Sequence, residues 1–277
     1  MTNRPSGITA GDWLKAAAQQ LGKSPTASLD ARLLLAEVLN LEPNQVLLHL
    51  DEHLNPNQLN KLSAIHKQRR DGVPLAYIVG RKDFADFQVK VNKSVLIPRP
   101  ETEAVLAAAI ECAREIKPQT IYEVGTGSGV LAIGMARALP GVEIIASDIS
   151  AAALRVAQTN ITEHGLDNQI QLVQSDLAVG IEDAELLVAN LPYLPTGLKV
   201  SREVKQEPGI ALWSGKDGLD HYRKLFTETK FGVAVIELGA NQYQILKSWV
   251  STHLNKASCS PITGLDSQTV GMIIRAN

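Results

Sequence analysis

The stretch "EVGTGSGVLAIGMA" at residues 123–136 joins an apolar strand to an apolar helix through a glycine-rich turn. Its three glycines, which alternate with a threonine and a serine, let the backbone turn tightly and come close to a ligand. The helix that follows offers free backbone N–H groups at its N-terminus. A nucleotide-like cofactor is therefore expected at this turn. Its predicted ligands there are Gly125, Thr126, Gly127, Ser128 and Gly129.

Apolar runs with the length of β-strands follow this turn and alternate with helix-length segments. The alternation predicts an α/β fold with a mostly parallel, doubly wound sheet. In such a sheet, ligands bind outside the carboxyl ends of the strands, where the strand order reverses. The predicted strands lie at residues 120–125, 142–148, 170–176, 184–190, 233–239 and 269–276.

Residues around the turn narrow the choice of cofactor. A dinucleotide fingerprint would need glycine where this chain has Val130, which disfavours a pyrophosphate and with it a nicotinamide-dependent dehydrogenase. Glu123 is better placed beside a cationic cofactor, and S-adenosylmethionine has that charge. At the next two predicted strand ends, Asp148 can accept both ribose hydroxyls and Asp176 can meet the adenine edge. Leu177 is expected to pack on the adenine ring.

A second stretch, "VANLPYLP" at residues 188–195, ends the fourth apolar run at Asn190, which joins the row of strand ends and faces the methyl donor. Its side-chain carbonyl and a neighbouring backbone carbonyl can together accept both hydrogens of a planar –NH₂ group. Pro192 holds Leu191 in an extended conformation, and the Tyr193 ring can lie against a flat amide or base. We expect Asn190, Pro192 and Tyr193 to be catalytic. The alternative is an ordinary turn in which the asparagine caps the strand.

The rest of the chain divides by its patterns. Residues 1–75 have helical periodicity and predict a small helical domain. In residues 76–100, the run "DFQVKVNKSVLIP" alternates apolar and polar residues on both sides of Asn92-Lys93, which predicts a β-hairpin linker. The catalytic domain that binds the cofactor is then expected at residues 101–277.

A basic cluster of Lys67, Arg69 and Arg70 closes the last helix predicted in the helical domain, just before Gly72. It can be a docking patch for a partner or a set of cations that complements the C-terminal dipole of the helix. The dipole interpretation is favoured.

The composition excludes several classes of function. The 27 lysines and arginines against 29 acidic residues create no general positive field, which argues against a nucleic-acid substrate. Cys112 and Cys259 lie far apart without Cys-x-x-Cys or Cys/His spacing, so neither a metal site nor a disulfide framework is indicated. The chain opens without an apolar signal core, and no apolar run approaches the roughly 20 residues that span a bilayer. A cytoplasmic location away from membranes is expected.

With these motifs together, the chain resembles the release factor glutamine methyltransferases, the PrmC/HemK family of class I methyltransferases. The likeness covers almost the whole chain. Its specific parts are "LIPRPETE" at 96–103 and "EPGIALWSGKDGLDHYRKL" at 207–225. The family usually has Asn-Pro-Pro-Tyr where this chain has Leu191 in second place, and leucine adds a backbone N–H that proline lacks.

The resemblance implies a Rossmann-like sheet of seven strands and a helical domain that docks the substrate protein. It implies N5-methylation, by S-adenosylmethionine, of the glutamine in the Gly-Gly-Gln motif of peptide chain release factors. The Gly-rich turn and Asp148 would bind the cofactor, and residues 190–193 would hold the glutamine amide. One alternative is an adenine N6-methyltransferase acting on RNA or DNA, against which the near-neutral charge argues. Another is a non-catalytic binding protein of the same fold, against which the intact Asn190-to-Tyr193 set argues.

Overall fold

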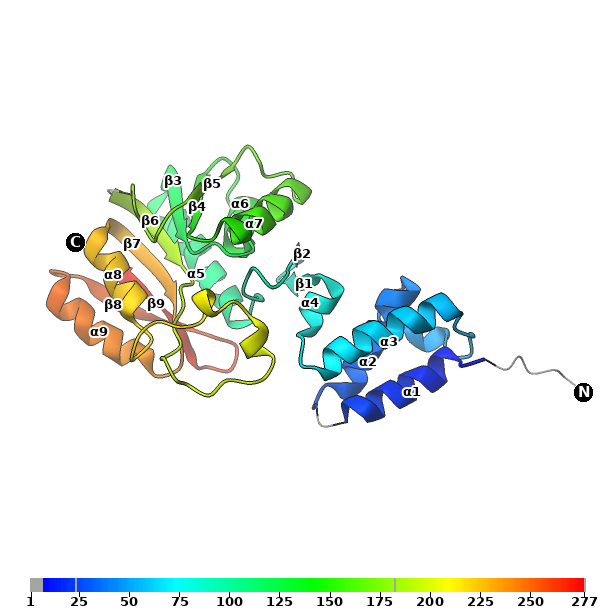
Figure 1. Ribbon diagram of the computed structural model, residues 1–277. Helices are drawn as coiled ribbons and strands as arrows, with labels where there is room; N and C mark the ends of the chain where they lie inside the picture. Colours follow the sequence, from blue (N-terminus) through cyan, green and yellow to red (C-terminus); the bar gives the residue numbers. More distant parts are fainter. Residues whose placement is uncertain (1–6, 23, 182, 277) are drawn as a thin grey trace, which may run out of the picture. The chain divides into compact units, whose positions relative to one another are not determined.

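The computed structural model describes residues 7–22, 24–181 and 183–276. They form two compact units (Figure 1). Unit 1 contains the described residues up to Gly80 together with the segment Arg202–Gln206. Unit 2 contains Arg81–Ser201 and the described residues from Glu207 onward. Each unit has its own apolar core.

Unit 1 is a helical bundle, which confirms the predicted helical N-terminal region. Its two best-defined helix starts follow Thr9 and Asn55, whose side chains each accept a hydrogen bond from a backbone N–H three residues on. The elements are α1 (Ala10–Leu21), α2 (Ala27–Leu39), the 3-10 helix η1 (Gln45–Leu48), α3 (Pro56–Arg70), α4 (Leu75–Val79) and the 3-10 helix η2 (Val204–Gln206). One cluster of its core contains the buried residues Ala10, Leu35, Ala36, Val46, Leu54 and Leu62.

The interpretation of the basic cluster as dipole cations is wrong for Arg69, which is buried inside unit 1. Its Nε donates to Asp30 Oδ2 at 2.7 Å, and its Nη2 donates to Glu203 Oε1 at 2.7 Å. Lys67 and Arg70 are exposed. Arg69 therefore ties α2, α3 and the Arg202–Gln206 segment together, because a buried guanidinium needs carboxylate partners.

The hairpin forms, but the predicted position of its turn is wrong. Strands β1 (Arg81–Phe84) and β2 (Phe87–Lys90) pair in antiparallel register around a turn that begins at Ala85, whose φ is +49°. Asn92 makes a separate turn, in which its backbone carbonyl accepts the N–H of Val95 at 3.1 Å. Val95 and its apolar neighbours are buried without forming a strand. The alternation of apolar and polar residues there comes from a coil that packs on the core.

Unit 2 contains the predicted mostly parallel sheet of seven strands (Figure 1). The strand order is β5-β4-β3-β6-β7-β9-β8, and β9 runs antiparallel to both of its neighbours, β7 and β8. The sequence patterns missed β8, an edge strand in which polar residues dominate and which contains Pro261. The strands are β3 (Thr120–Val124), β4 (Glu143–Asp148), β5 (Ile170–Gln174), β6 (Asp183–Ala189), β7 (Lys230–Glu237), β8 (Ser258–Thr263) and β9 (Thr269–Arg275).

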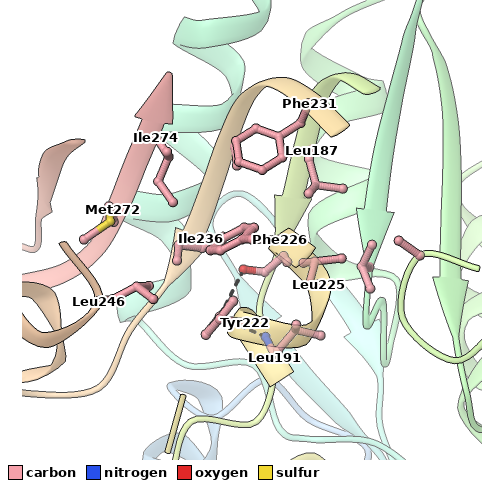
Figure 2. Packing of buried hydrophobic residues seen from close by; sticks show 14 of the residues in the cluster. Leu187, Leu191, Tyr222, Leu225, Phe226, Phe231, Ile236, Leu246, Met272 and Ile274 are labelled. Atoms are coloured by element: carbon pink, nitrogen blue, oxygen red, sulfur yellow. Dashed lines mark hydrogen bonds between the residues drawn. The ribbon is translucent and has the colours of Figure 1, made fainter. Parts of the chain in front are cut away.

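Helices cover both faces of this sheet, as a doubly wound fold requires. They are α5 (Glu101–Ile116), α6 (Val130–Ala138), α7 (Ala151–Glu163), α8 (Asp220–Glu228) and α9 (Gln242–His253), with a 3-10 helix η3 (Gly209–Ala211). Figure 2 shows Tyr222 and Phe226 of α8 packed on Leu187, Ile236 and Ile274 of the sheet. In the described part of the chain, no helix combines the length and apolar character needed to cross a membrane.

The strand order determines where a ligand site is expected on the sheet. From β3 the chain moves outward through β4 and β5, and then returns to the other side of β3 to form β6. The sheet therefore has its topological switch point between β3 and β6, where a crevice opens at the carboxyl ends of the strands.

Candidate active site

A cavity of about 220 Å³ in unit 2 lies at these strand ends. Two predicted site residues, Gly129 and Tyr193, are not part of its lining. The predicted residues that do line it are Gly125, Thr126, Gly127, Ser128, Asp148, Asp176, Leu177, Asn190, Leu191 and Pro192.

The first and third glycines of the turn are needed for different structural reasons. Gly125 has a φ of +80°, and a Cβ there would lie 2.9 Å from Cδ2 of Leu191. Gly129 has a φ of +82° at the start of α6, and its Cβ would lie 3.3 Å from that of Ala157. The first glycine therefore makes room for the Asn190 loop, and the third allows α6 to pack against α7.

Glu123 lines the cavity and is almost completely buried. Its Oε2 accepts a hydrogen bond from the Thr126 hydroxyl at 2.8 Å, but burial raises the pKa of the carboxyl to about 7. Among the described residues that line the cavity there is no lysine or arginine. A cationic ligand would restore the charged form of Glu123, so the site fits S-adenosylmethionine better than a diphosphate.

The carboxylate of Asp148 is held by two backbone N–H groups, one of them from the glycine-rich turn. Its Oδ2 accepts the N–H of Gly127 at 2.9 Å, and its Oδ1 accepts that of Ser150 at 2.8 Å. Burial is the main cause that raises the pKa of this carboxyl. Each oxygen keeps a further acceptor site, so the side chain can still bind a pair of hydroxyls.

Asp176 and Leu177 differ in burial at the end of β5. The Asp176 side chain is half-exposed and forms an ion pair with Lys224 Nζ at 2.8 Å. Leu177 is buried with a φ of +54°, a conformation that is costly for a branched side chain. Both residues line the cavity, and their contact with an adenine stays a prediction.

The amide group of Asn190 has one orientation because of its neighbours. Its Nδ2 donates to Glu237 Oε2 at 2.9 Å and to Thr102 Oγ1 at 3.3 Å. Its Oδ1 is buried without a hydrogen-bond partner. An unpaired buried carbonyl is costly unless a ligand completes it, so Asn190 is poised to accept a hydrogen bond.

The backbone N–H of Leu191, which a proline would lack, has a buried partner. It donates to the Tyr222 hydroxyl at 3.1 Å, and that hydroxyl donates to the backbone carbonyl of Glu237 at 2.6 Å. Tyr222 is fully buried on α8. The loop after β6 is therefore hydrogen-bonded to both α8 and the end of β7.

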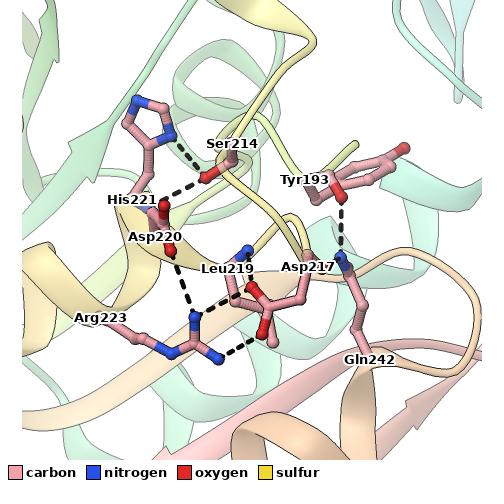
Figure 3. Close-up of polar contacts among 8 residues, drawn as sticks. All are labelled: Tyr193, Ser214, Asp217, Leu219, Asp220, His221, Arg223 and Gln242. Carbon is pink, nitrogen blue, oxygen red and sulfur yellow. Dashed lines mark hydrogen bonds and ion pairs between the residues drawn. The ribbon is translucent and has the colours of Figure 1, made fainter. Parts of the chain in front are cut away.

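Tyr193 turns its hydroxyl toward Glu237 Oε1, at 3.2 Å. Its backbone carbonyl accepts a hydrogen bond from Gln242 Nε2 at 2.7 Å (Figure 3). Burial and the nearby Glu237 raise the pKa of the phenol, so it stays neutral. Tyr193 therefore supports the loop in this structure, and its contact with a substrate stays a prediction.

The segment 207–225 supports the loop and one wall of the cavity. Asp217 binds the guanidinium of Arg223 (Figure 3). The backbone carbonyl of Asp217 accepts a hydrogen bond from Gln242 Nε2 at 2.9 Å. His221 bonds to Ser214 Oγ at 2.6 Å and lines the cavity. These contacts fix the start of α8 and so the position of Tyr222.

Sequence reasoning missed four residues that hold the site. Glu237 had a detectable signal, since it is an acidic residue within two positions of the end of a predicted strand, and it ends the observed strand β7. Asn160 had no such signal: its side chain joins the Lys90 backbone of β2 to the Ser128 carbonyl of the glycine-rich turn, at 2.7–3.0 Å. The missed residues are Thr102, Asn160, Tyr222 and Glu237.

Comparisons with known proteins agree with this architecture. Residues 12–80 match the family described as the PrmC N-terminal domain, and residues 100–195 match the ribosomal protein L11 methyltransferase family (PrmA). The hMettl16 catalytic domain, solved in complex with a MAT2A 3′UTR hairpin, has a TM-score of 0.56 at 14% identity. The likeness covers 76% of this chain and 81% of that domain, and at this identity it shows the fold alone.

Two relatives are similar over most of their length. A release factor glutamine methyltransferase of Moorella thermoacetica is 37% identical over 228 residues, which cover 79% of this chain and 81% of the relative. One of Deinococcus radiodurans is 36% identical over 207 residues, which cover 74% of each. Identity of this level across both units shows that the chain belongs to the release factor glutamine methyltransferase family.

Proposed function

We propose that this protein methylates N5 of the glutamine side chain in the Gly-Gly-Gln motif of peptide chain release factors. The observation that carries the proposal is the unpaired, buried Oδ1 of Asn190 in a residue that lines the cavity. An acceptor of this kind suits a substrate that presents a planar –NH₂ group, as a glutamine amide does. Two relatives with the same function in their names support it.

S-adenosylmethionine is the cofactor of this family, and when bound it supplies an activated methyl group. Residues of the cavity fit it: the turn from Gly125 to Gly129 allows close approach, Glu123 offers a carboxylate to its cationic groups, and Asp148 offers acceptors to its ribose hydroxyls. We further propose that Asp176 and Leu177 contact its adenine.

Asn190 and Leu191 hold the substrate nitrogen in this proposal. The Asn190 Oδ1 and the Leu191 backbone carbonyl each accept one hydrogen of the amide, and Pro192 keeps the two acceptors converging. An amide nitrogen is a poor nucleophile because its lone pair is delocalised. Most of the acceleration must therefore come from alignment, which can lower a barrier by roughly 7–11 kcal/mol. The neutral phenol of Tyr193 is not a base here.

We propose that unit 1 binds the release factor and that the reaction takes place in the cytoplasm without a nucleic-acid substrate. The match of residues 12–80 to a domain that accompanies this family supports a role in substrate binding. Unit 1 also exposes the apolar side chains of Leu47 and Leu48, which suit a protein surface.

The test is a transfer assay with methyl-labelled S-adenosylmethionine. The protein is offered, separately, a release factor, the same factor with the motif glutamine replaced by alanine, ribosomal RNA and duplex DNA. Label is expected on the intact release factor alone, and label on RNA or DNA alone would refute the proposal. Asn190→Ala should abolish transfer and leave cofactor binding largely intact.

A further inference from the structure

Glu237 is a buried carboxylate that faces Asn190 from the neighbouring strand. Ala189 pairs with Ile236 in the parallel register of β6 and β7, which brings Asn190 and Glu237 side by side at the sheet edge. Glu237 is 1% exposed. Its two oxygens accept hydrogen bonds from the amide of Asn190 and the hydroxyl of Tyr193, and the Thr102 hydroxyl adds a third.

The chemistry of a carboxylate determines which end of the Asn190 amide it meets. An ionised carboxylate only accepts hydrogen bonds, so the –NH₂ end of Asn190 must face it. The carbonyl end is then left for the cavity, as the unpaired Oδ1 shows. If Glu237 donated a proton instead, the amide would be stable in the opposite orientation and would turn its –NH₂ toward the substrate –NH₂. Two donors facing each other cannot bond.

We propose that Glu237 is a positioning residue: it sets the orientation of the Asn190 amide, so that Oδ1 and not Nδ2 meets the substrate nitrogen. The proposal rests on the proposed function for its consequence in catalysis. Glu237 itself does not line the cavity and touches neither cofactor nor substrate. Its effect passes through Asn190, with Thr102 as the second acceptor that completes the –NH₂ group.

The same contacts predict a dependence on pH. Burial, with the charge of Glu101 as a smaller contribution, raises the pKa of Glu237 to about 7. The other titratable groups that face it are the phenols of Tyr193 and Tyr222, both neutral. Transfer should therefore rise with pH up to about 7 and then level off, falling about tenfold per pH unit on the acid side.

Two substitutions separate orientation from simple support of the fold. Glu237→Gln has nearly the shape of the protonated acid and, unlike the carboxylate, can donate a hydrogen bond to Asn190. It should lower kcat at every pH to the level that the wild type reaches well below pH 7, and lose the acid-side fall. Glu237→Leu removes the acceptor and should lower kcat by about 10- to 100-fold at every pH. Neither should change the Kd for S-adenosylmethionine, which also controls for correct folding.

The kinetic comparison is made at saturating cofactor, because the pKa of Glu123 is similar. An acid-side fall that persists in Glu237→Gln would come from another group and would overturn the proposal. A wild-type kcat in Glu237→Gln at pH 8 would do the same, because a residue that merely supports the fold would tolerate the isosteric amide, whereas orientation of Asn190 requires a group that cannot donate.

A measurement without substrate keeps this inference separate from the proposed function. In protein labelled with [¹⁵N]asparagine, the side-chain amide signal of Asn190 is identified by its absence in Asn190→Ala. That signal should shift with pH near 7 in the wild type and stay constant in Glu237→Gln. A wild-type signal that is constant from pH 5.5 to 8.5 would refute the role of Glu237, whichever substrate the enzyme uses. Absence of transfer to release factors would refute only the proposed function.

Discussion

Removing the hydroxyl of Tyr222 tests how the chain accommodates leucine at position 191. This hydroxyl lies between the Leu191 N–H, at 3.1 Å, and the Glu237 carbonyl, at 2.6 Å. Tyr222 is 0% exposed, so water cannot replace the lost group. Tyr222→Phe keeps the ring and its packing on Phe226 and leaves a buried donor and a buried acceptor short of a partner.

The size of the effect follows from those two groups. An unpaired buried group costs about 1–3 kcal/mol, and a carbonyl tolerates loss of one partner better than an N–H does. We expect Tyr222→Phe to lower the free energy of unfolding by about 2–4 kcal/mol. Leu191→Pro removes the N–H itself. In that background the same Tyr222→Phe change should cost about 1–2 kcal/mol less, which is the coupling energy of the pair.

The double-mutant cycle can be measured by denaturant unfolding. Two of the three tryptophans, Trp213 and Trp249, lie in unit 2, and a Trp13→Phe background makes fluorescence report on that unit alone. The expected result is a smaller shift of the unfolding midpoint for Tyr222→Phe when proline is at position 191. Additive effects, with a coupling energy near zero, would show that Tyr222 does not stabilise the Leu191 N–H.

Four further substitutions or titrations probe the rest of the molecule. Asp148→Ala should raise the Kd for S-adenosylmethionine at least about tenfold by calorimetry, since it removes the acceptors for the ribose; an unchanged Kd would contradict that role. Gly125→Ala should lower the free energy of unfolding by about 1–3 kcal/mol in urea, because the backbone there has a positive φ. Arg69→Met should destabilise unit 1 by about 3–5 kcal/mol by circular dichroism, and adding Asp30→Leu should restore most of the loss. Cofactor binding should release protons below pH 7, because a cationic ligand lowers the raised pKa of Glu123. The affinity for S-adenosylmethionine should then increase with pH up to about 7. Calorimetry in buffers of different ionisation enthalpy measures the proton release.

The sequence predicted the parts of the fold that depend on local patterns. Apolar runs and the turn at Gly125 located the parallel strands, because a buried strand and a tight turn each need particular residues at adjacent positions. The carboxyl ends of parallel strands meet at one edge of the sheet, and this general property placed Asp148 and Asn190 at the same cavity. Edge strand β8 has no apolar run, because one side of an edge strand meets solvent, and it was missed.

Local sequence patterns could not predict contacts between residues that are far apart in the chain. The partners of Asn190 come from α5 and β7, and the partners of Arg69 come from α2 and from Glu203, more than a hundred residues away. Its charge and its position in the last turn of a helix made Arg69 resemble a surface cation. The structure buries its side chain, which therefore pairs with carboxylates inside unit 1. The hairpin turn was misplaced because alternating apolar residues also occur where a coil packs on a core.

Both acceptors proposed for the substrate amide depend on one residue of β7. The side chain of Glu237 orients the Asn190 amide, and its backbone carbonyl holds the hydroxyl of Tyr222, which in turn holds the N–H of Leu191. A proline at position 191 would restrict the loop through its ring, whereas leucine leaves that torsion free and depends on the Tyr222 hydrogen bond instead. The loop can therefore remain ordered without the second proline, because the hydroxyl of Tyr222, held in place by β7, supplies the restraint that the ring would have given.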